Sequence, residues 1–317
     1  MPQGESPAPF RFFAPTSFWN EPLAPNAALD PSSSAIMSAV AGEVARGEVT
    51  GESPQTSIDT TSYSVPIYTV PASQPLVPVL LNKPTAIPAL SAAWSDVPLP
   101  PGARPAQGTD GELVVWQPST DRLWEFFQLV GGPSGWSATF GGAVQDVSTN
   151  PGVYGPEAWP GANGGWGASG SSLSIAGGLI TLEDLRRGVI DHALAMSSPN
   201  VREGVFAYPA RRTDGRSASP LALPEGAHLR LDPNLNVPSL HLPHLTQMIA
   251  LAAQRYGIIV GEGGPNYGFY GQDPTPTGTD PYLGPDGYFE GKQANKVLAS
   301  FPWNHMQLLA MQLQSAG

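Results

Sequence analysis

Cysteine is absent from this chain of 317 residues. Without thiols there is no disulfide bridge, no thiolate nucleophile, no cysteine-ligated zinc and no iron–sulfur cluster. The sequence also lacks a Gly-x-Ser-x-Gly elbow, a Walker phosphate loop, a His-Glu-x-x-His pair and a dinucleotide-binding glycine fingerprint. Serine hydrolases, nucleotide enzymes and zinc peptidases are therefore unsupported. His241 and His244 have metal-compatible spacing but no third ligand nearby, so we expect no metal and no cofactor.

Positive charge is scarce. Lys and Arg together number 15 against 26 Asp and Glu, which gives a formal net charge of −11. A surface this acidic repels phosphate backbones and anionic lipid headgroups, so we expect neither nucleic acid nor a membrane as a partner. Neutral ligands such as a polysaccharide or an oligosaccharide are not disfavoured. The composition leaves the oligomeric state open.

Long apolar segments are also missing. No run of 18 apolar residues is present, and the first residues, Met1–Glu5, have neither a basic nor an apolar signal region. Few lysines, frequent Trp, Gly and Ser, and a Pro-rich beginning are typical of exported bacterial proteins that act on polysaccharides. We therefore expect a secreted protein in its mature form, with the signal peptide absent from this sequence.

Glycine and proline, by contrast, are abundant, with 36 residues of each. So many helix breakers exclude long helices and coiled coils, and the 28 aromatic residues (8 Trp, 9 Tyr and 11 Phe) exclude a disordered chain. We expect a single domain over residues 1–317. Within it, residues 1–31 form an extended Pro-rich arm, and residues 146–171 and 261–291 form two long loops.

Strand patterns outnumber helix patterns. An antiparallel meander is predicted from three strands over residues 112–117, 122–130 and 136–140. Further strands are predicted at residues 189–196, 204–208, 228–231, 258–260 and 266–270, and helices at 32–48, 181–187, 243–256, 292–299 and 303–313. Because strands and helices do not alternate regularly, we expect a mainly β fold: an antiparallel, jelly-roll-like β-sandwich with a few peripheral helices.

Several short motifs resemble a recurring pattern. They are Trp166–Leu173, Ala176–Thr181, Ile190–Leu194, Tyr208–Ala210, Thr213–Gly215, Leu229–Pro233 and Ala253–Gly257. The pattern resembles that of exported bacterial proteins of mostly uncharacterised function, over residues 110–275. The resemblance implies an exported setting and a shared fold, and it implies no reaction and no catalytic residue.

Carboxylates are the candidate catalytic groups, because glycoside hydrolysis needs an acid and a base or nucleophile on opposite sides of the bond. Glu125 lies in the middle of a strand rich in aromatic residues. Apolar surroundings would raise its pKa and suit it to act as a general acid. The alternative is a strand glutamate that faces water.

Asp191 and His192 form a second candidate pair. As neighbours on a strand they point to opposite faces, so only one of them can face a cleft. The alternatives are a hydrogen-bonded core histidine and an aspartate that accepts hydrogen bonds from the preceding Arg-Arg-Gly turn. Asp146, at the mouth of the first long loop, is a third candidate carboxylate, and its alternative is a turn-forming role.

Aromatic residues in loops are the clearest positive signal. Sugar rings stack on such side chains while polar groups bond the hydroxyls. The candidate substrate-binding residues are Trp159, Trp166, Asn163 and Tyr154 in the first loop, Tyr270 in the second, and Arg211 and Asp214 beside a turn. The alternatives are aromatic residues that fix the loops to the body, and an Asp214–Gly215 turn.

These features predict a secreted carbohydrate-active enzyme, foremost a glycoside hydrolase that acts on a polysaccharide. Its carboxylate pair would be Glu125 with Asp191, or Glu125 with Asp146. A non-catalytic, lectin-like or extracellular structural protein is the alternative, because it needs the same aromatic residues but no carboxylate pair. A polysaccharide lyase ranks third, because the net charge of −11 disfavours an anionic polymer.

Overall fold

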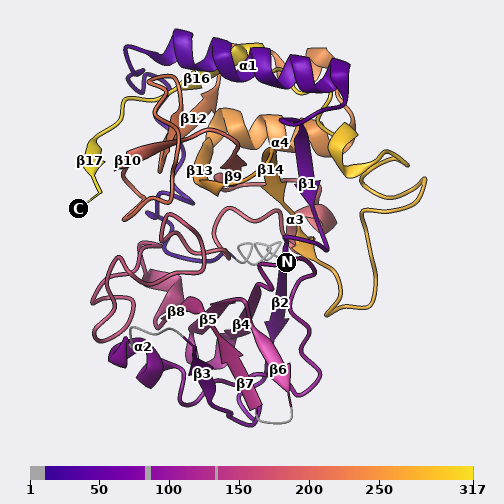
Figure 1. The fold of residues 1–317 in the computed structure, drawn as a ribbon. Coiled ribbons are helices and arrows are strands. Elements are labelled where there is room, and N and C mark those ends of the chain that lie inside the picture. Colours follow the sequence, from indigo (N-terminus) through magenta and orange to yellow (C-terminus); the bar gives the residue numbers. More distant parts are fainter. Residues whose placement is uncertain (1–10, 83–86, 133–134, 317) are drawn as a thin grey trace, which may run out of the picture.

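The computed structural model describes residues 11–82, 87–132 and 135–316. The first ten residues of the predicted N-terminal arm lie outside this part of the chain. Within these described ranges most of the regular structure is strand, arranged in several sheets with four α-helices (Figure 1). The mainly β class is thus confirmed. No α-helix in the described part of the chain is both long and apolar enough to cross a membrane.

The largest sheet has six strands in mixed directions. In spatial order they are β1 (Thr56–Asp59), β14 (Tyr267–Tyr270), β9 (Leu194–Ser198), β13 (Ile258–Gly263), β12 (His228–Leu231) and β16 (Met306–Leu308). The pairs β1–β14 and β9–β13 are parallel, and the other three pairs are antiparallel. Parallel pairing means that a purely antiparallel sandwich is not confirmed.

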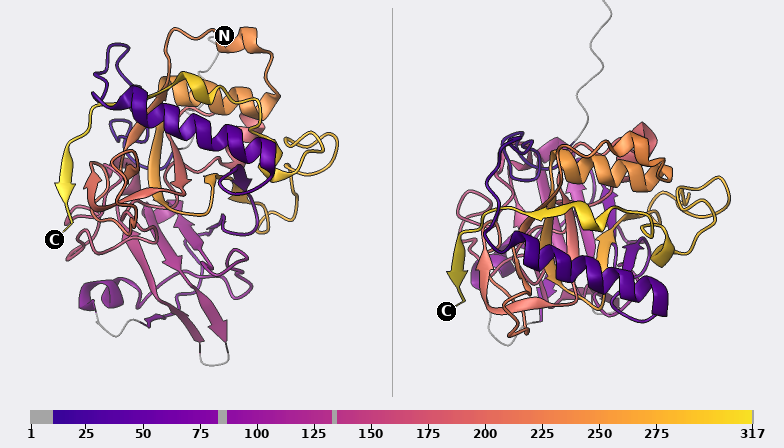
Figure 2. Two further views of the ribbon diagram at one scale, coloured as in Figure 1. Left: turned by 45° about the horizontal axis from the view of Figure 1, so that its top comes forward. Right: turned by 90° about the horizontal axis from the view of Figure 1, so that it is seen from above.

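Two helices cover one face of this sheet, as the view from above shows (Figure 2). They are α1 (Ser33–Thr50) and α4 (His244–Arg255), and both contribute apolar side chains to a core with strands β9, β13 and β14. In α4 the apolar residues recur at helical spacing, and the buried set is Leu245, Thr246, Met248, Ile249, Ala250, Ala252 and Ala253. This helix was predicted within one residue at each end.

A second layer of sheets lies on the other side (Figure 1). Its main sheet has the order β15 (Gln272–Asp273), β2 (Val65–Thr69), β4 (Leu113–Gln117), β5 (Arg122–Phe127) and β8 (Phe140–Val144). A small sheet of β3 (Val79–Leu81), β7 (Gly135–Ala138) and β6 (Val130–Gly132), and helix α2 (Pro88–Ala93), complete it. The predicted third strand at 136–140 was wrong: β7 pairs with β6, and β8 pairs with β5.

The remaining regular elements lie at the periphery. They are the sheet β11 (Leu223–Glu225), β10 (Val201–Ala207) and β17 (Leu313–Ser315), and the short helix α3 (Leu182–Arg187). Thr181 and Asp184 form a reciprocal capping box at the start of α3. The helices predicted at residues 292–299 and 303–313 were wrong. The chain there forms 3-10 turns and strands β16 and β17, because strand partners outweigh weak helical patterns.

The chain passes between the two layers twice at one place. Strand β1 of the six-stranded sheet leads to β2 of the second layer, which is the lower layer in Figure 1. Strand β14, which pairs with β1, leads in the same way to β15, which pairs with β2. The two crossings are hydrogen-bonded: the Gly271 amide donates to the Asp59 carbonyl at 2.8 Å, and the Ser64 hydroxyl donates to the Gly271 carbonyl at 2.6 Å. The layers are therefore joined by two adjacent segments of chain.

Candidate functional site

Glu125, the predicted general acid, is fully buried in the lower layer, with an exposed fraction of 0%. Its carboxylate accepts hydrogen bonds from the Ala168 amide at 2.9 Å, the Ser174 hydroxyl at 2.7 Å and the Ile175 amide at 3.1 Å. Burial raises the pKa of Glu125, and these hydrogen bonds oppose the rise. A general acid must reach the substrate, whereas this carboxylate is enclosed. Its placement supports a structural role, holding the loop that follows Trp166 against the sheet.

The aromatic residues of the first long loop also point inward. Trp166 and Tyr154 are buried, with ring centroids 6.4 Å apart. Trp159 is half-buried between Trp124, at 6.2 Å, and the Arg122 guanidinium, at 5.4 Å. Packing in this layer stabilises the loop. This arrangement matches the alternative of aromatic residues that fix the loop to the body.

The polar candidates of the same region remain apart from one another. Asn163 is exposed, and its side-chain oxygen accepts the Gly165 amide at 2.8 Å. Asp146 is exposed in a left-handed turn with a φ of 51°, as its turn-forming alternative predicted. Arg211 is exposed, while the next residue, Arg212, donates to the carbonyls of Gly165, Gly167, Ser169 and Gly170. Arg212 thus fixes the loop, which the sequence did not indicate.

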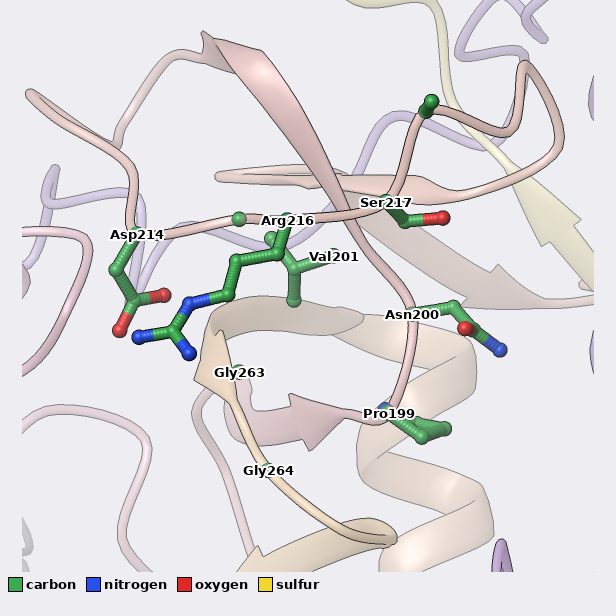
Figure 3. Close-up of a pocket in the computed structure, with 10 residues that line it drawn as sticks. Pro199, Asn200, Val201, Asp214, Arg216, Ser217, Gly263 and Gly264 are labelled. Carbon is green, nitrogen blue, oxygen red and sulfur yellow. The ribbon is translucent and has the colours of Figure 1, made fainter.

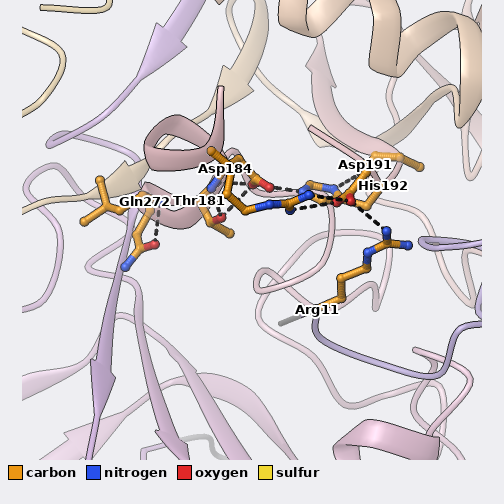
Figure 4. Close-up of polar contacts among 9 residues, drawn as sticks. Arg11, Thr181, Asp184, Asp191, His192 and Gln272 are labelled. Atoms are coloured by element: carbon orange, nitrogen blue, oxygen red, sulfur yellow. Dashed lines mark hydrogen bonds and ion pairs between the residues drawn. The ribbon is translucent and has the colours of Figure 1, made fainter. Parts of the chain in front are cut away.

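Asp191 and His192 belong to a polar network beside α3 (Figure 4). Asp191 forms ion pairs with Arg11 at 2.7 Å and with Arg187 at 2.9 Å. Partial burial opposes ionisation of Asp191, but the Arg187 and Arg11 guanidiniums outweigh it, so its pKa is lowered. An anion held by two cations is a poor base. Asp191 therefore ties the N-terminal arm to the end of α3.

His192 is buried on the other side of this network. Its Nε2 lies 3.1 Å from Asp184 Oδ2, and its Nδ1 lies 2.8 Å from the Ala193 carbonyl oxygen. Burial lowers the pKa of His192, but the Asp184 carboxylate outweighs it and the pKa is raised. The adjoining cavity holds about 30 Å³, room for a water molecule but not for a substrate. This is the hydrogen-bonded core histidine that the sequence left as an alternative.

Two larger cavities adjoin each other at Gly263 and Gly264. The first, here called the acidic cavity, has a volume of about 380 Å³. It is lined by Ser57, Asp59, Tyr63, Asp110, Glu112, Ser197, Tyr270 and residues 262–266. Of the predicted site residues, Tyr270 lines this cavity.

The second cavity, here called the outer cavity, holds about 670 Å³. It is lined by residues 199–201, 214–218, 263 and 264, and so it contains the predicted residue Asp214. In Figure 3 the side chains of Asp214 and Arg216 lie toward one end and that of Asn200 toward the other. The Asp214 amide donates to Glu225 Oε2 at 3.0 Å, which fixes the turn that carries the aspartate.

Strand register explains how one wall of the acidic cavity forms. Ser57 of β1 pairs with Gly268 of β14, and Ser197 of β9 pairs with Glu262 of β13. Side chains next to these residues along each strand point to the opposite face of the sheet and enter the core under the helices. They are Ile58, Met196, Val260 and Phe269. Alternation thus separates a polar face from an apolar one. A Cβ on Gly268 would lie 2.8 Å from the Ser197 hydroxyl, so the crowded polar face requires glycine there.

Glu262 reaches the cavity because of a β-bulge. Val260 pairs with Met196 and Glu262 pairs with Ser197, so Gly261 is an extra residue in β13. Strict alternation from Val260 would turn Glu262 into the apolar core. The bulge places it on the polar face instead, which is why the pattern of the sequence did not indicate it. The available signal was the Gly-Glu-Gly-Gly run at the end of a buried strand.

Glu112, just before β4, also lines the acidic cavity. It is only 4% exposed, and no described residue forms a hydrogen bond with its carboxyl group. Burial raises its pKa well above the usual range, and the Glu262, Asp110 and Glu125 carboxylates raise it further. Two close carboxylates do not both ionise readily. Glu112 therefore holds its proton more tightly than an ordinary glutamate does.

Glu262 and Asp59 complete the acidic set. Burial raises the pKa of Glu262 to about 7, although the Tyr270 hydroxyl donates a hydrogen bond that lowers it. Burial likewise raises the pKa of Asp59 to about 6, against a hydrogen bond from Ser57 at 3.4 Å. Glu262 has a hydrogen-bond donor and Glu112 has none among the described residues, which favours ionisation of Glu262 over that of Glu112. The cavity thus combines a carboxyl group whose pKa is raised well above the usual range with one whose pKa is about 7.

The lining of the acidic cavity includes four carboxyl groups and no lysine, arginine or histidine. In the described part of the chain, no group of three or more His, Asp or Glu side chains is placed to hold a metal ion. Sequence reasoning did not indicate Asp59, Asp110, Glu112 or Glu262, whereas Tyr270 was among the predicted substrate-binding residues.

Comparison of the chain with protein-family models, with curated proteins and with solved structures gave no match in any of the three. The residues and their geometry therefore carry the functional argument alone.

Proposed function

We propose that this protein is a carbohydrate-active hydrolase that cleaves glycosidic bonds in the acidic cavity. One observation carries the proposal: Glu112, buried and without a hydrogen-bond partner among the described residues, faces the same cavity as Glu262, whose pKa is about 7. A protonated acid beside an ionisable carboxylate is the combination that glycoside hydrolysis uses. An exported setting, as the composition led us to expect, is part of the proposal.

In this mechanism Glu112 acts as the general acid. Burial raises its pKa and so favours the protonated form, which can donate to the glycosidic oxygen as the bond to the leaving sugar breaks. Glu262, in its ionised form and hydrogen-bonded by the Tyr270 hydroxyl, acts either as the base that activates a water to attack the anomeric carbon or as the nucleophile that bonds to this carbon until water releases the sugar. Tyr63, 45% exposed at the wall of the cavity, offers a ring face for stacking against a sugar.

Two other readings of the sequence fit the cavity less well. A polysaccharide lyase needs a cation to neutralise the uronate carboxylate, and the acidic cavity has none in its lining. A lectin-like protein needs neither a carboxyl group with a raised pKa nor an ionisable carboxylate in the same cavity. Glycan binding without turnover remains the outcome that would favour the lectin.

The test is product formation on a panel of plant, fungal and bacterial cell-wall glycans, measured as new reducing ends. We expect cleavage of at least one glycan, and Glu262→Gln should lower the rate by about two orders of magnitude or more. Glu203→Gln is the matched control, because Glu203 is exposed on β10 and outside both cavities. Binding without products on every glycan would overturn the proposal, as would an unchanged rate in Glu262→Gln.

A further inference from the structure

Resting on the proposed function, we propose that the acidic cavity recognises a positively charged sugar, so that the substrate is a polysaccharide with free amino groups. The inference begins from the charges in its wall. Asp59, Asp110, Glu112 and Glu262 line the cavity without any cationic side chain among the lining residues. The nearest electrostatic influences on Glu112 and Glu262 are other carboxylates. The field in this cavity therefore attracts cations and repels anions.

The second observation is the unpartnered carboxyl group of Glu112. It is 4% exposed, lines the cavity, and receives no hydrogen bond from any described residue. Buried polar groups normally have partners, and an exception calls for one from outside the protein. Glu125, on the neighbouring strand β5, accepts three hydrogen bonds from the protein and therefore needs no partner from outside. An ammonium group carries three N–H donors, one of which can bond the Glu112 carboxyl oxygen that does not carry the proton, while the neighbouring carboxylates balance its positive charge.

The shape of the cavity favours an amino sugar over a bare cation. A volume of about 380 Å³ suits a small organic ligand and is far larger than a metal ion needs. No set of three described His, Asp or Glu side chains is arranged to ligate a metal. The phenol rings of Tyr63 and Tyr270 also line the cavity, and aromatic faces attract ammonium groups.

Protonation links the cavity to such a ligand. The pKa values of about 6 for Asp59 and about 7 for Glu262 mean that both carboxyl groups hold part of their protons near neutral pH. A bound ammonium group favours the ionised forms and lowers both pKa values. Binding should therefore release protons between pH 6 and 7, and affinity should rise with pH over that window while the amine stays charged.

The experiment compares glucosamine oligomers with N-acetylated oligomers and with uronate oligomers of the same length. Binding is measured by calorimetry in two buffers of different ionisation enthalpy, and cleavage is measured as kcat/KM. We expect glucosamine oligomers to be preferred by about tenfold or more, the effect of one pKa unit of coupling, with net proton release. An equal response to N-acetylated oligomers, or a preference for uronates, would overturn the inference.

Two variants, each of which removes one negative charge, distinguish the effect of the cavity charges on ligand preference from the effect of the net charge of the molecule. Asp110→Asn lies in the cavity wall and should reduce the preference for glucosamine oligomers several-fold. Asp286→Asn removes an exposed carboxylate outside both cavities and should leave the preference unchanged. Equal effects of the two variants would attribute the preference to overall charge and overturn the inference.

The two proposals fail separately. Cleavage of a neutral glycan without a preference for free amines removes the cationic sugar and keeps the hydrolase. Proton-releasing binding of glucosamine oligomers without cleavage removes the hydrolase and keeps the cationic sugar. Calcium chloride and magnesium chloride are titrated alone as a further arm. Metal binding that Asp110→Asn abolishes, and that displaces the oligomer, would overturn the ammonium assignment.

Discussion

Two buried glutamates on neighbouring stretches of the chain have opposite surroundings. Glu125 is enclosed by β4, β8 and the segment after Trp166, and three donors satisfy its carboxylate. Glu112, just before β4, is almost as buried but faces a cavity and has no described donor. In both cases burial raises the pKa.

The difference teaches that a raised pKa does not by itself identify a catalytic acid. Surroundings rich in aromatic residues raise the pKa of Glu125, but its hydrogen bonds commit it to the fold. Glu112 has unused hydrogen-bonding capacity and an adjoining space, so it is free to interact with a ligand. The four predictions below test this contrast, from the largest expected effect to the smallest.

Replacing Glu112 by Gln should separate activity from stability. The amide cannot donate an acidic proton to the leaving group, so the rate should fall by about 10²- to 10⁴-fold. Because the carboxyl group has no described partner, thermal unfolding should be unchanged or shifted upward. The measurement pairs reducing-end assays with unfolding curves. A Glu112→Gln variant that keeps its activity would contradict the assignment of Glu112 as the general acid.

The substitution Glu125→Gln should have the reverse effect. An amide nitrogen would face N–H or O–H donors that now find an acceptor, and each unsatisfied buried group costs about 1–3 kcal/mol. We expect a lower free energy of unfolding in denaturant titrations and an unchanged turnover per folded molecule. Glu203→Gln, an exposed substitution, is the reference. Unaltered stability with lost activity would return the catalytic role to Glu125.

Glu225 is a third buried glutamate, and its raised pKa should make the stability of the protein depend on pH. Burial is the main cause that raises the pKa of Glu225 to about 8, and its Oε1 has no partner in the structure. The folded state then holds a proton that the unfolded state releases above a pKa of about 4.5, so stability falls as pH rises from about 4.5 to about 8.

Glu225→Gln removes this penalty. Its melting temperature should match that of the natural protein near pH 4.5 and exceed it by about 2 °C or more at pH 8 to 9. Scanning calorimetry across this range measures the difference. A constant offset at all pH values would show that Glu225 does not carry the proton.

The smallest effect is expected from Tyr270→Phe. The Tyr270 hydroxyl lowers the pKa of Glu262 by donating to its carboxylate, so its loss should raise that pKa. The acidic limb of the pH–rate profile, expected near pH 7, should move upward by about one unit or less. Tyr68→Phe, which removes a hydroxyl bonded to Arg104 outside the cavity, should leave the profile in place. A downward shift of the limb would contradict the assignment of Glu262.

Local patterns predicted the local elements well. Helix α4, the strand His228–Leu231 and the hairpin of β4 and β5 follow from apolar periodicity and turn residues, and the Thr181–Asp184 cap was visible in the sequence. The errors came where long-range pairing decides. Strand β16 pairs with β12 across 75 residues or more, and no local pattern shows that partner.

The site was harder to predict for the same physical reason. Asp59 and Tyr270 meet because β1 pairs with β14, some 200 residues later in the chain. A one-residue bulge at Gly261 reverses the direction of Glu262, and alternation cannot anticipate it. The enclosure of Glu125 also depends on a loop that returns from residue 166 onward. Residue type suggested carboxylate chemistry, and the proposal that Glu112 and Glu262 carry it depends on the fold.

The double crossing between the layers limits how the cavity can open. Hinge closure needs a few residues that absorb a large change in backbone angles. Here the connections β1–β2 and β14–β15 run side by side and are hydrogen-bonded to each other. The two layers therefore resist swinging apart as rigid bodies. Under the proposed function, a glycan therefore meets a preformed cavity and not one that closes around it.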